Sequence, residues 1–181
     1  LEETARTFAN QRQVTTVKAG SLPDKIPFEN EKYDLIVAFD VIEHIDDDVA
    51  ALEALRTHLK PGGWLVLTVP AFQFLWSHHD DINHHRRRYN LKGLQQVVRK
   101  ADFAVHYSTY FNTFLFPVVA AVRNAQKLLR IDNKSQISSD LTLPSAPVNK
   151  FLTFLFATER HLINKFRLPF GVSALLVGHK I

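Results

Sequence analysis

The chain has 181 residues, 46% of them hydrophobic, and a formal net charge of +4 with neutral histidines. This length suits one domain with its own core, and the mild basic charge allows an anionic ligand without requiring nucleic acid. The absence of Cys excludes disulfides, thiolate metal sites and a Cys nucleophile, and leaves the cytoplasm as the expected location. We see no apolar run long enough to span a bilayer and no signal peptide.

The first part of the chain predicts strands and helices in alternation. Residues 1–10 have the pattern of a helix end, and the β-branched run Val14–Lys18 predicts a strand. The continuous apolar run Tyr33–Phe39 predicts a strand buried on both faces, as in a parallel sheet. The aspartates at 46–48 are suited to capping a helix, which we prefer to an acidic metal cluster because consecutive helical side chains diverge. The apolar positions that follow at helical spacing are Val49, Leu52, Leu55 and Leu59.

The same alternation continues after this helix. The KPGG stretch at 60–63 predicts the helix end, and Trp64–Val69 predicts a second buried strand that Pro70 ends. Asn90 is expected to cap another helix. Phe103–Tyr110 and Ser173–Lys180 predict two further strands. The result is a doubly wound α/β sheet, in which ligands bind outside the carboxyl ends of the strands.

Two segments stand apart from this alternation. Residues 113–130 and about 147–166 predict helices that are apolar on nearly all sides, so each is expected to be buried. We interpret 112–169 as a helical insertion that forms a lid, a dimer interface or a membrane-surface element. The core of the domain would then comprise 1–111 and 170–181.

The loop WSHHDDINHHRRRYN at 76–90 follows a strand end, so we expect it to lie beside the ligand-binding crevice. Its adjacent histidine pairs lack the spacing of a metal motif. Its aspartates offset part of the positive charge that binding to nucleic acid would need. A solvated turn remains one interpretation. We favour a loop that closes over a substrate, because Arg86 and Arg88 are suited to a phosphate or carboxylate. Trp76 and Asp80 complete the predicted substrate-binding residues, and no metal is expected.

The motifs DVIEH (40–44), LKPGG (59–63) and VP (69–70), at this spacing, resemble the middle of class I S-adenosyl-L-methionine-dependent methyltransferases. The resemblance runs from about Val14 to Phe103 and points to a bacterial type 11/12-like group. It implies a Rossmann-like sheet of order 3-2-1-4-5-7-6 with the last strand antiparallel. The implied third to seventh strands are Val14–Lys18, Leu35–Phe39, Trp64–Val69, Phe103–Tyr110 and Ser173–Lys180.

The resemblance also implies the cofactor site. S-adenosyl-L-methionine would lie along the turns after the third and fourth strands, with the adenine beside the first of these turns. The implied cofactor-binding residues are Gly20, Ser21, Leu22, Phe39, Asp40 and Val41. The family's glycine-rich loop has no counterpart, because no Gly precedes Gly20, and the chain has no Met, so Leu1 is not a translation start. We therefore expect further residues upstream, or else completion by a partner chain.

Three side chains are candidates for handling the acceptor's proton. His44 has an ordinary pKa near neutrality and is interpreted as a general base, with a structural histidine as the alternative. His79 and Tyr89 are the other two. The predicted function is a methyltransferase for a small-molecule or lipid-linked anionic acceptor, in the cytoplasm or at the inner membrane face, with a homodimer or a membrane contact formed through 112–169. The alternative is a non-catalytic binding or scaffold protein on a degenerate methyltransferase fold.

Overall fold

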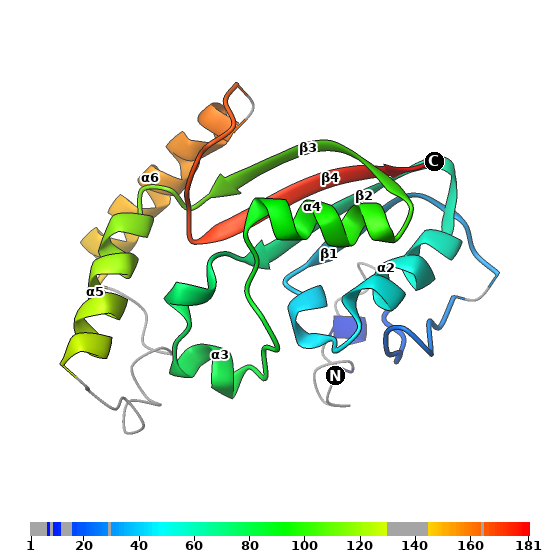
Figure 1. Ribbon diagram of the computed structural model, residues 1–181, viewed down its shortest axis with the longest axis horizontal. Coiled ribbons are helices and arrows are strands. Elements are labelled where there is room, and N and C mark those ends of the chain that lie inside the picture. The colour runs from blue at the N-terminus through cyan, green and yellow to red at the C-terminus, as the bar shows by residue number, and fades with distance from the viewer. Residues whose placement is uncertain (1–6, 8, 12–15, 29, 130–144, 164) are drawn as a thin grey trace.

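The computed structural model describes residues 7, 9–11, 16–28, 30–129, 145–163 and 165–181. Within these residues, four strands form one sheet of order β1-β2-β4-β3 (Figure 1). β1 is parallel to β2, and β4 is antiparallel to both β2 and β3. This arrangement agrees with the one expected for the last four strands, and the α/β fold class is confirmed. The strand bounds are β1 Tyr33–Phe39, β2 Leu59–Pro70, β3 Phe103–Phe111 and β4 Ser173–Lys180.

The helices begin where the sequence places capping side chains. The carboxylate of Asp47 accepts a hydrogen bond from the backbone N–H of Ala50 at 2.9 Å, and Asn90 accepts one from Gly93 at 2.7 Å. Both predicted caps are therefore confirmed. Residues 7 and 9–11 are also helical. The helix bounds are η1 Ile42–His44, α2 Asp48–Thr57, η2 Gln73–Leu75, α3 His78–Ile82, α4 Leu91–Lys100, α5 Phe116–Leu128 and α6 Ala146–Ile163.

The core lies between the sheet and the pair α2 and α4, which cover the near face of the sheet in Figure 1. Because side chains alternate along a strand, β2 places Leu65, Leu67 and Val69 on this face, all fully buried. Leu94 and Val98 of α4 are equally buried and belong to the same core. Each such side chain stabilises the fold by about 1.5–3 kcal/mol relative to an exposed one.

Three expectations about the strands were wrong in part. Val14 and Thr15 lie outside the described residues, and the rest of the predicted strand, 16–18, is not a strand. Leu59 is not on the preceding helix, which ends at Thr57, but begins β2. β1 is not buried on both faces: Ala38 is buried and Ile36 packs against the core, whereas the opposite face is exposed. Its outward side chains Leu35, Val37 and Phe39 are 51–56% exposed.

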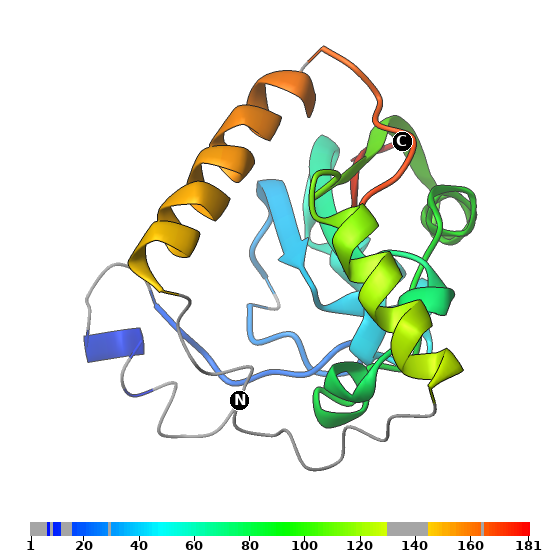
Figure 2. The ribbon, with the colours of Figure 1, turned by 90° about the vertical axis from the view of Figure 1, so that its left-hand side faces the viewer.

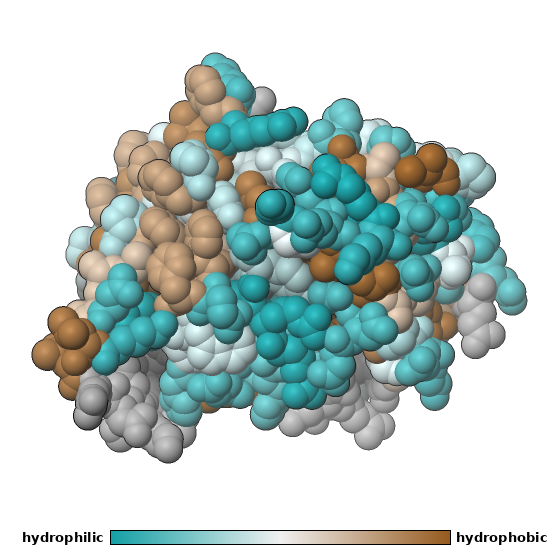
Figure 3. Space-filling view, viewed as in Figure 1, coloured by the Kyte–Doolittle hydropathy of each residue, from teal (hydrophilic) through white to brown (hydrophobic). Residues whose placement is uncertain are grey.

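The expectation that the two apolar helices are buried was also wrong. Figure 2 shows α6 on the opposite side of the sheet from α4, and no residue of α5 is buried. Val118, Phe151 and Phe154 are 60–66% exposed, and apolar surface gathers over α5 in Figure 3. The segment 130–144 between the helices lies outside the described residues. None of the described helices is long and apolar enough to cross a membrane.

Candidate functional site

The candidate site lies where β1 and β2 end. Because the two strands are parallel, their carboxyl ends meet at the same edge of the sheet. Asp40 follows β1 with a φ of 52°, and its backbone N–H donates to the Thr68 carbonyl of β2 at 2.9 Å. This left-handed residue turns the chain sharply into η1. The η1 turn carries Glu43 and His44, and the loop 76–90 closes against it through a 2.7 Å hydrogen bond from Arg86 N–H to the Glu43 carbonyl.

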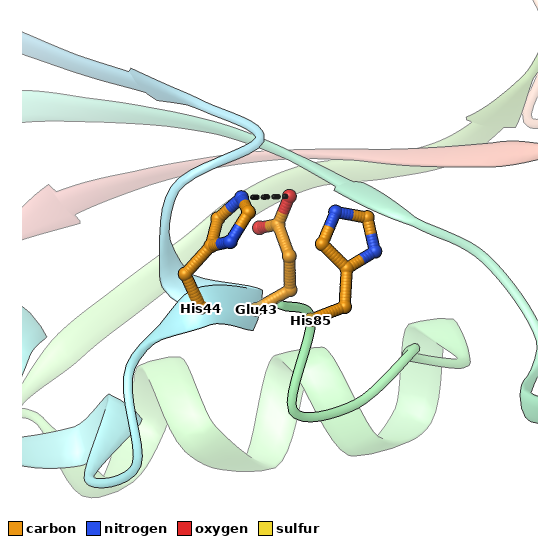
Figure 4. A group of neighbouring side chains, drawn as sticks. All are labelled: Glu43, His44 and His85. Carbon is orange, nitrogen blue, oxygen red and sulfur yellow. Dashed lines mark ion pairs between the residues drawn. The ribbon is translucent and has the colours of Figure 1, made fainter. Parts of the chain in front are cut away.

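Glu43, His44 and His85 form a compact cluster at this edge (Figure 4). The Glu43 carboxyl is fully buried, and neither of its oxygens has a hydrogen-bond partner among the described residues. Burial raises the pKa of Glu43 to about 7. Burial also lowers the pKa of His44, and the neighbouring His85 lowers it further. The 3.8 Å contact between Glu43 Oε1 and His44 Nε2 is therefore closer to a neutral pair than to an ion pair.

Asp80 organises the loop behind this cluster. It is fully buried, and Arg88 donates to both of its oxygens, from Nε at 2.7 Å and from an Nη at 3.0 Å. Ser77 N–H donates at 2.8 Å, and His85 Nδ1 lies 2.9 Å away. Burial alone would raise the pKa of Asp80, but the hydrogen bonds from Arg88 and His85 outweigh it and hold the pKa below its usual value. Because of the Ser77–Asp80 capping box, the segment 78–82 is a short helix, α3, rather than the open loop we expected.

Tyr89 is tied into the core rather than exposed to a ligand. Its buried hydroxyl donates to Asp48 Oδ2 at 2.7 Å, and Arg87 reaches the same oxygen at 3.1 Å. Burial, together with this hydrogen bond, raises the pKa of Tyr89 well above its ordinary value. A phenol that keeps its proton so firmly is poorly suited to act as a base. These contacts favour a structural role for Tyr89.

The remaining residues predicted in the loop are more open to solvent. Arg86 is 54% exposed and pairs with the exposed Asp46 at 3.1 Å, so its guanidinium is accessible to an anion. Trp76 donates from its indole N–H to Asp81 at 2.9 Å, and His79 lies on the exposed side of α3. The structure thus directs the Arg86 side chain to Asp46, whereas it gives Arg88 the partner Asp80 within its own loop.

The six predicted cofactor residues do not lie in one place. Phe39, Asp40 and Val41 stand at the carboxyl end of β1, where the exposed Phe39 ring offers an apolar surface to an adenosine. The turn 20–22 leads instead into Pro23, which lines a hollow with His58 at the C-terminal end of α2. His58 accepts a hydrogen bond from the first residue of β1, so the turn at 20–22 lies near the start of this strand. Residues 39–41 lie at the opposite end of β1, about 20 Å away. The turn at 20–22 therefore does not lie beside the residues at 39–41.

Glu43 and His85 are the site residues that sequence reasoning missed. The motif signal was present, since Glu43 precedes His44 in DVIEH. The burial of Glu43 depends on the loop 76–90 folding over η1, which no local pattern encodes. In the sequence, His85 reads as one half of an adjacent histidine pair with His84. In the structure the two do not act as a pair, because His84 adopts a left-handed φ of 57°.

A comparison with protein families gives a match between residues 4–108 and the family described as methyltransferase domain. A ubiquinone biosynthesis O-methyltransferase from Cereibacter sphaeroides is 34% identical over 62 residues, which are 34% of this chain and 25% of that protein. The chain thus covers about a quarter of this curated relative. The comparison favours a methyltransferase over the scaffold alternative.

Solved structures of low sequence identity share the fold. An S-adenosylmethionine-dependent methyltransferase from Clostridium acetobutylicum aligns with a TM-score of 0.55 at 11% identity, over 98% of this chain and 70% of that one. A SAM-dependent methyltransferase from Thermotoga maritima aligns with a TM-score of 0.53 at 16% identity, over 99% and 70% of the two chains. The family match covers more than half of the chain, and the sheet order is the one that the resemblance implied. The chain belongs to the methyltransferase domain family.

Proposed function

We propose that the protein carrying this chain transfers a methyl group from S-adenosyl-L-methionine to a small-molecule or lipid-linked anionic acceptor. The observation that carries the proposal is the family match over 4–108, joined to a cluster of titratable side chains, one of them buried, at the strand edge where this fold binds ligands. The sulfonium already activates the methyl group. The protein must therefore align the acceptor, exclude water and, for a hydroxyl or amine acceptor, accept a proton.

The residues at the end of β1 would hold the cofactor. Phe39 would pack on the adenosine, and main-chain groups of Asp40 and Val41 would meet its methionine end. His44 stands one turn further along, 39% exposed and with a lowered pKa, so it is neutral near pH 7 and able to accept a proton. We assign it the role of general base.

Arg86 is the group proposed to bind the acceptor's anion. Its guanidinium is accessible, and it lies in the loop that contacts Glu43, beside the proposed base. Asp46, its present partner, is 83% exposed, so exchanging that carboxylate for a phosphate or carboxylate of the acceptor costs little. Arg88 is less suited, since leaving Asp80 would strand a buried charge.

Steady-state kinetics with cofactor and acceptor varied separately tests this assignment. Arg86→Ala is expected to raise the acceptor KM about tenfold or more and to leave the cofactor KM nearly unchanged, because a charge-assisted hydrogen bond is lost. Arg99→Ala, an exposed arginine in the last turn of α4, is the matched control. Equal effects of the two substitutions, or an effect confined to the cofactor KM, would contradict the role given to Arg86.

The segment 112–169 is proposed to contact a lipid surface or a second copy of the chain. The support is the exposed apolar surface of α5 and α6, which includes Val118, Phe151 and Phe154. Phe154→Asp tests this without disturbing the fold, whereas Phe116 packs against Phe72 and is unsuitable. Vesicle co-sedimentation and light scattering should show weaker membrane association or loss of a dimer. Unchanged lipid binding and oligomeric state would leave the segment as a lid.

A further inference from the structure

We propose that Glu43, His44 and His85 form a binding site for a divalent transition-metal ion of the zinc type. One ligand atom from each side chain can be chosen so that all lie within 4.8 Å of one another. Figure 4 shows the Glu43 carboxyl between the two imidazole rings, so the three groups face a common point. Two of them come from η1 and the third from the loop 76–90, which are far apart in the sequence.

The spacing needs little adjustment for a metal ion. Zinc bonds of about 2.0–2.1 Å in a tetrahedral arrangement place neighbouring ligand atoms about 3.3–3.4 Å apart. Glu43 Oε1 and His44 Nε2 are 3.8 Å apart already. The remaining distances must shrink by about 1.5 Å at most, which small side-chain rotations can provide.

The buried, unpaired carboxyl of Glu43 is the strongest evidence that a cation binds here. Its side chain is fully buried, and both of its oxygens lack a hydrogen-bond partner among the residues that the structure describes. A buried carboxyl without a partner costs stability, and a cation would satisfy it. The charge of Asp40 also disfavours ionisation of Glu43, and a cation bound at the carboxyl would offset this effect.

The groups around the cluster orient the two imidazoles as metal ligands require. Asp80 Oδ1 lies 2.9 Å from His85 Nδ1, which leaves Nε2 as the ring nitrogen available to the ion. His44 also presents its Nε2 to Glu43, at 3.8 Å from Oε1. A carboxylate or carbonyl on the far nitrogen of a histidine is the arrangement that fixes the tautomer in metal sites.

The types of ligand indicate which metals the site would bind and what role the ion would have. Imidazole nitrogens suit zinc, cobalt, nickel or iron, whereas magnesium and calcium prefer oxygen ligands throughout. Three protein ligands leave a coordination position open, as in catalytic rather than structural zinc sites. This position would take an oxygen of the acceptor, and that use rests on the proposed methyltransferase function. In the metal-bound protein His44 would be a ligand, and the ion would assist the loss of the acceptor's proton in place of the base role that His44 has in the metal-free protein. The site departs from the expectation of no metal, which rested on the histidine pairs of the loop and on the aspartates at 46–48.

Metal binding can be measured without the methyl-transfer reaction. The untagged intact protein is titrated with Co²⁺ and followed by its visible absorption, and Zn²⁺ is then added as a competitor. We expect one saturable site, displaced by Zn²⁺. Glu43→Gln and His85→Gln should each weaken Co²⁺ binding by about tenfold or more. His106→Gln, an exposed histidine on β3 outside the cluster, should bind Co²⁺ as the unaltered protein does.

Circular dichroism establishes that each variant is folded, and His44→Gln, at a half-exposed position, serves as a third variant should a buried substitution unfold the chain. No saturable Co²⁺ binding to the intact protein would overturn the proposal. Binding that survives in all the folded cluster variants would overturn it equally. Because the titration contains no S-adenosyl-L-methionine, a protein that binds the cofactor but no metal would refute this site and leave the proposed methyltransferase standing.

Discussion

The pair Arg88–Asp80 should decide the stability of the loop 76–90. Asp80 is fully buried and the Arg88 side chain is 9% exposed, and two hydrogen bonds of 2.7 and 3.0 Å join them. Arg88→Ala removes the cation and leaves the carboxylate in the protein interior. Breaking a buried pair on one side costs about 3–5 kcal/mol. Ser77 and His85 still donate to Asp80, so we expect about 3 kcal/mol, at the lower end of that range.

Urea denaturation followed by circular dichroism measures this loss. Arg86→Ala is the matched control, because Arg86 is 54% exposed and pairs with an exposed carboxylate. It should cost less than about 1 kcal/mol. In a double-mutant cycle, Asp80→Asn should lower the free energy of unfolding much less in the Arg88→Ala background than in the unaltered protein. In that background the substitution removes a buried carboxylate that has already lost its cation. A loss below about 1 kcal/mol for Arg88→Ala, or equal losses for both arginines, would refute the buried-pair account.

Three further predictions concern single positions. Gly171→Ala should destabilise the protein by at least about 2 kcal/mol in urea, because its Cβ would lie 2.1 Å from the Phe111 carbonyl oxygen, and a near-unchanged midpoint would contradict this packing. Tyr89→Phe should cost about 1 kcal/mol through the lost hydrogen bond to Asp48 and should leave kcat intact, whereas a large fall in kcat without a stability change would restore the catalytic role. Glu43→Gln tests how the stability of the protein depends on pH. The folded pKa of Glu43 is about 7 against an ordinary 4.5, so the metal-free protein should lose stability as pH rises between these values, and the variant should not. Above pH 7, with chelator present, the variant should be more stable by up to about 3 kcal/mol, and identical pH profiles would contradict the burial of a lone carboxyl.

The strands and caps could be predicted because their signals are local. Tyr33–Phe39 has the composition and length of a strand, and Asp47 and Asn90 cap helices through bonds to residues three positions away. What covers an element is not a local property. The apolar runs of α5 and α6 predicted burial, yet no described residue of α5 is buried and Phe151 and Phe154 of α6 are exposed.

The candidate site shows the same division. The DVIEH motif located His44 at the strand end, and the loop could be assigned to the same edge. The partners of its arginines could not be assigned, because they depend on how the loop folds. α3 and the left-handed His84 reverse the chain, so Arg88 turns inward to Asp80 and Arg86 stays open. Charge patterns cannot tell an internal ion pair from a ligand contact, since both use the same guanidinium.

Calorimetric titration of the intact natural protein with S-adenosyl-L-methionine tests the central claim most directly. The account predicts saturable binding at one site. It also predicts that substituting Phe39, the exposed apolar residue at the end of β1, by Asp weakens this binding by about tenfold or more, because its apolar contact with the adenosine is lost. Absence of binding heat at high cofactor concentration, with the protein folded, would contradict the proposal that the protein carrying this chain is an S-adenosyl-L-methionine-dependent methyltransferase.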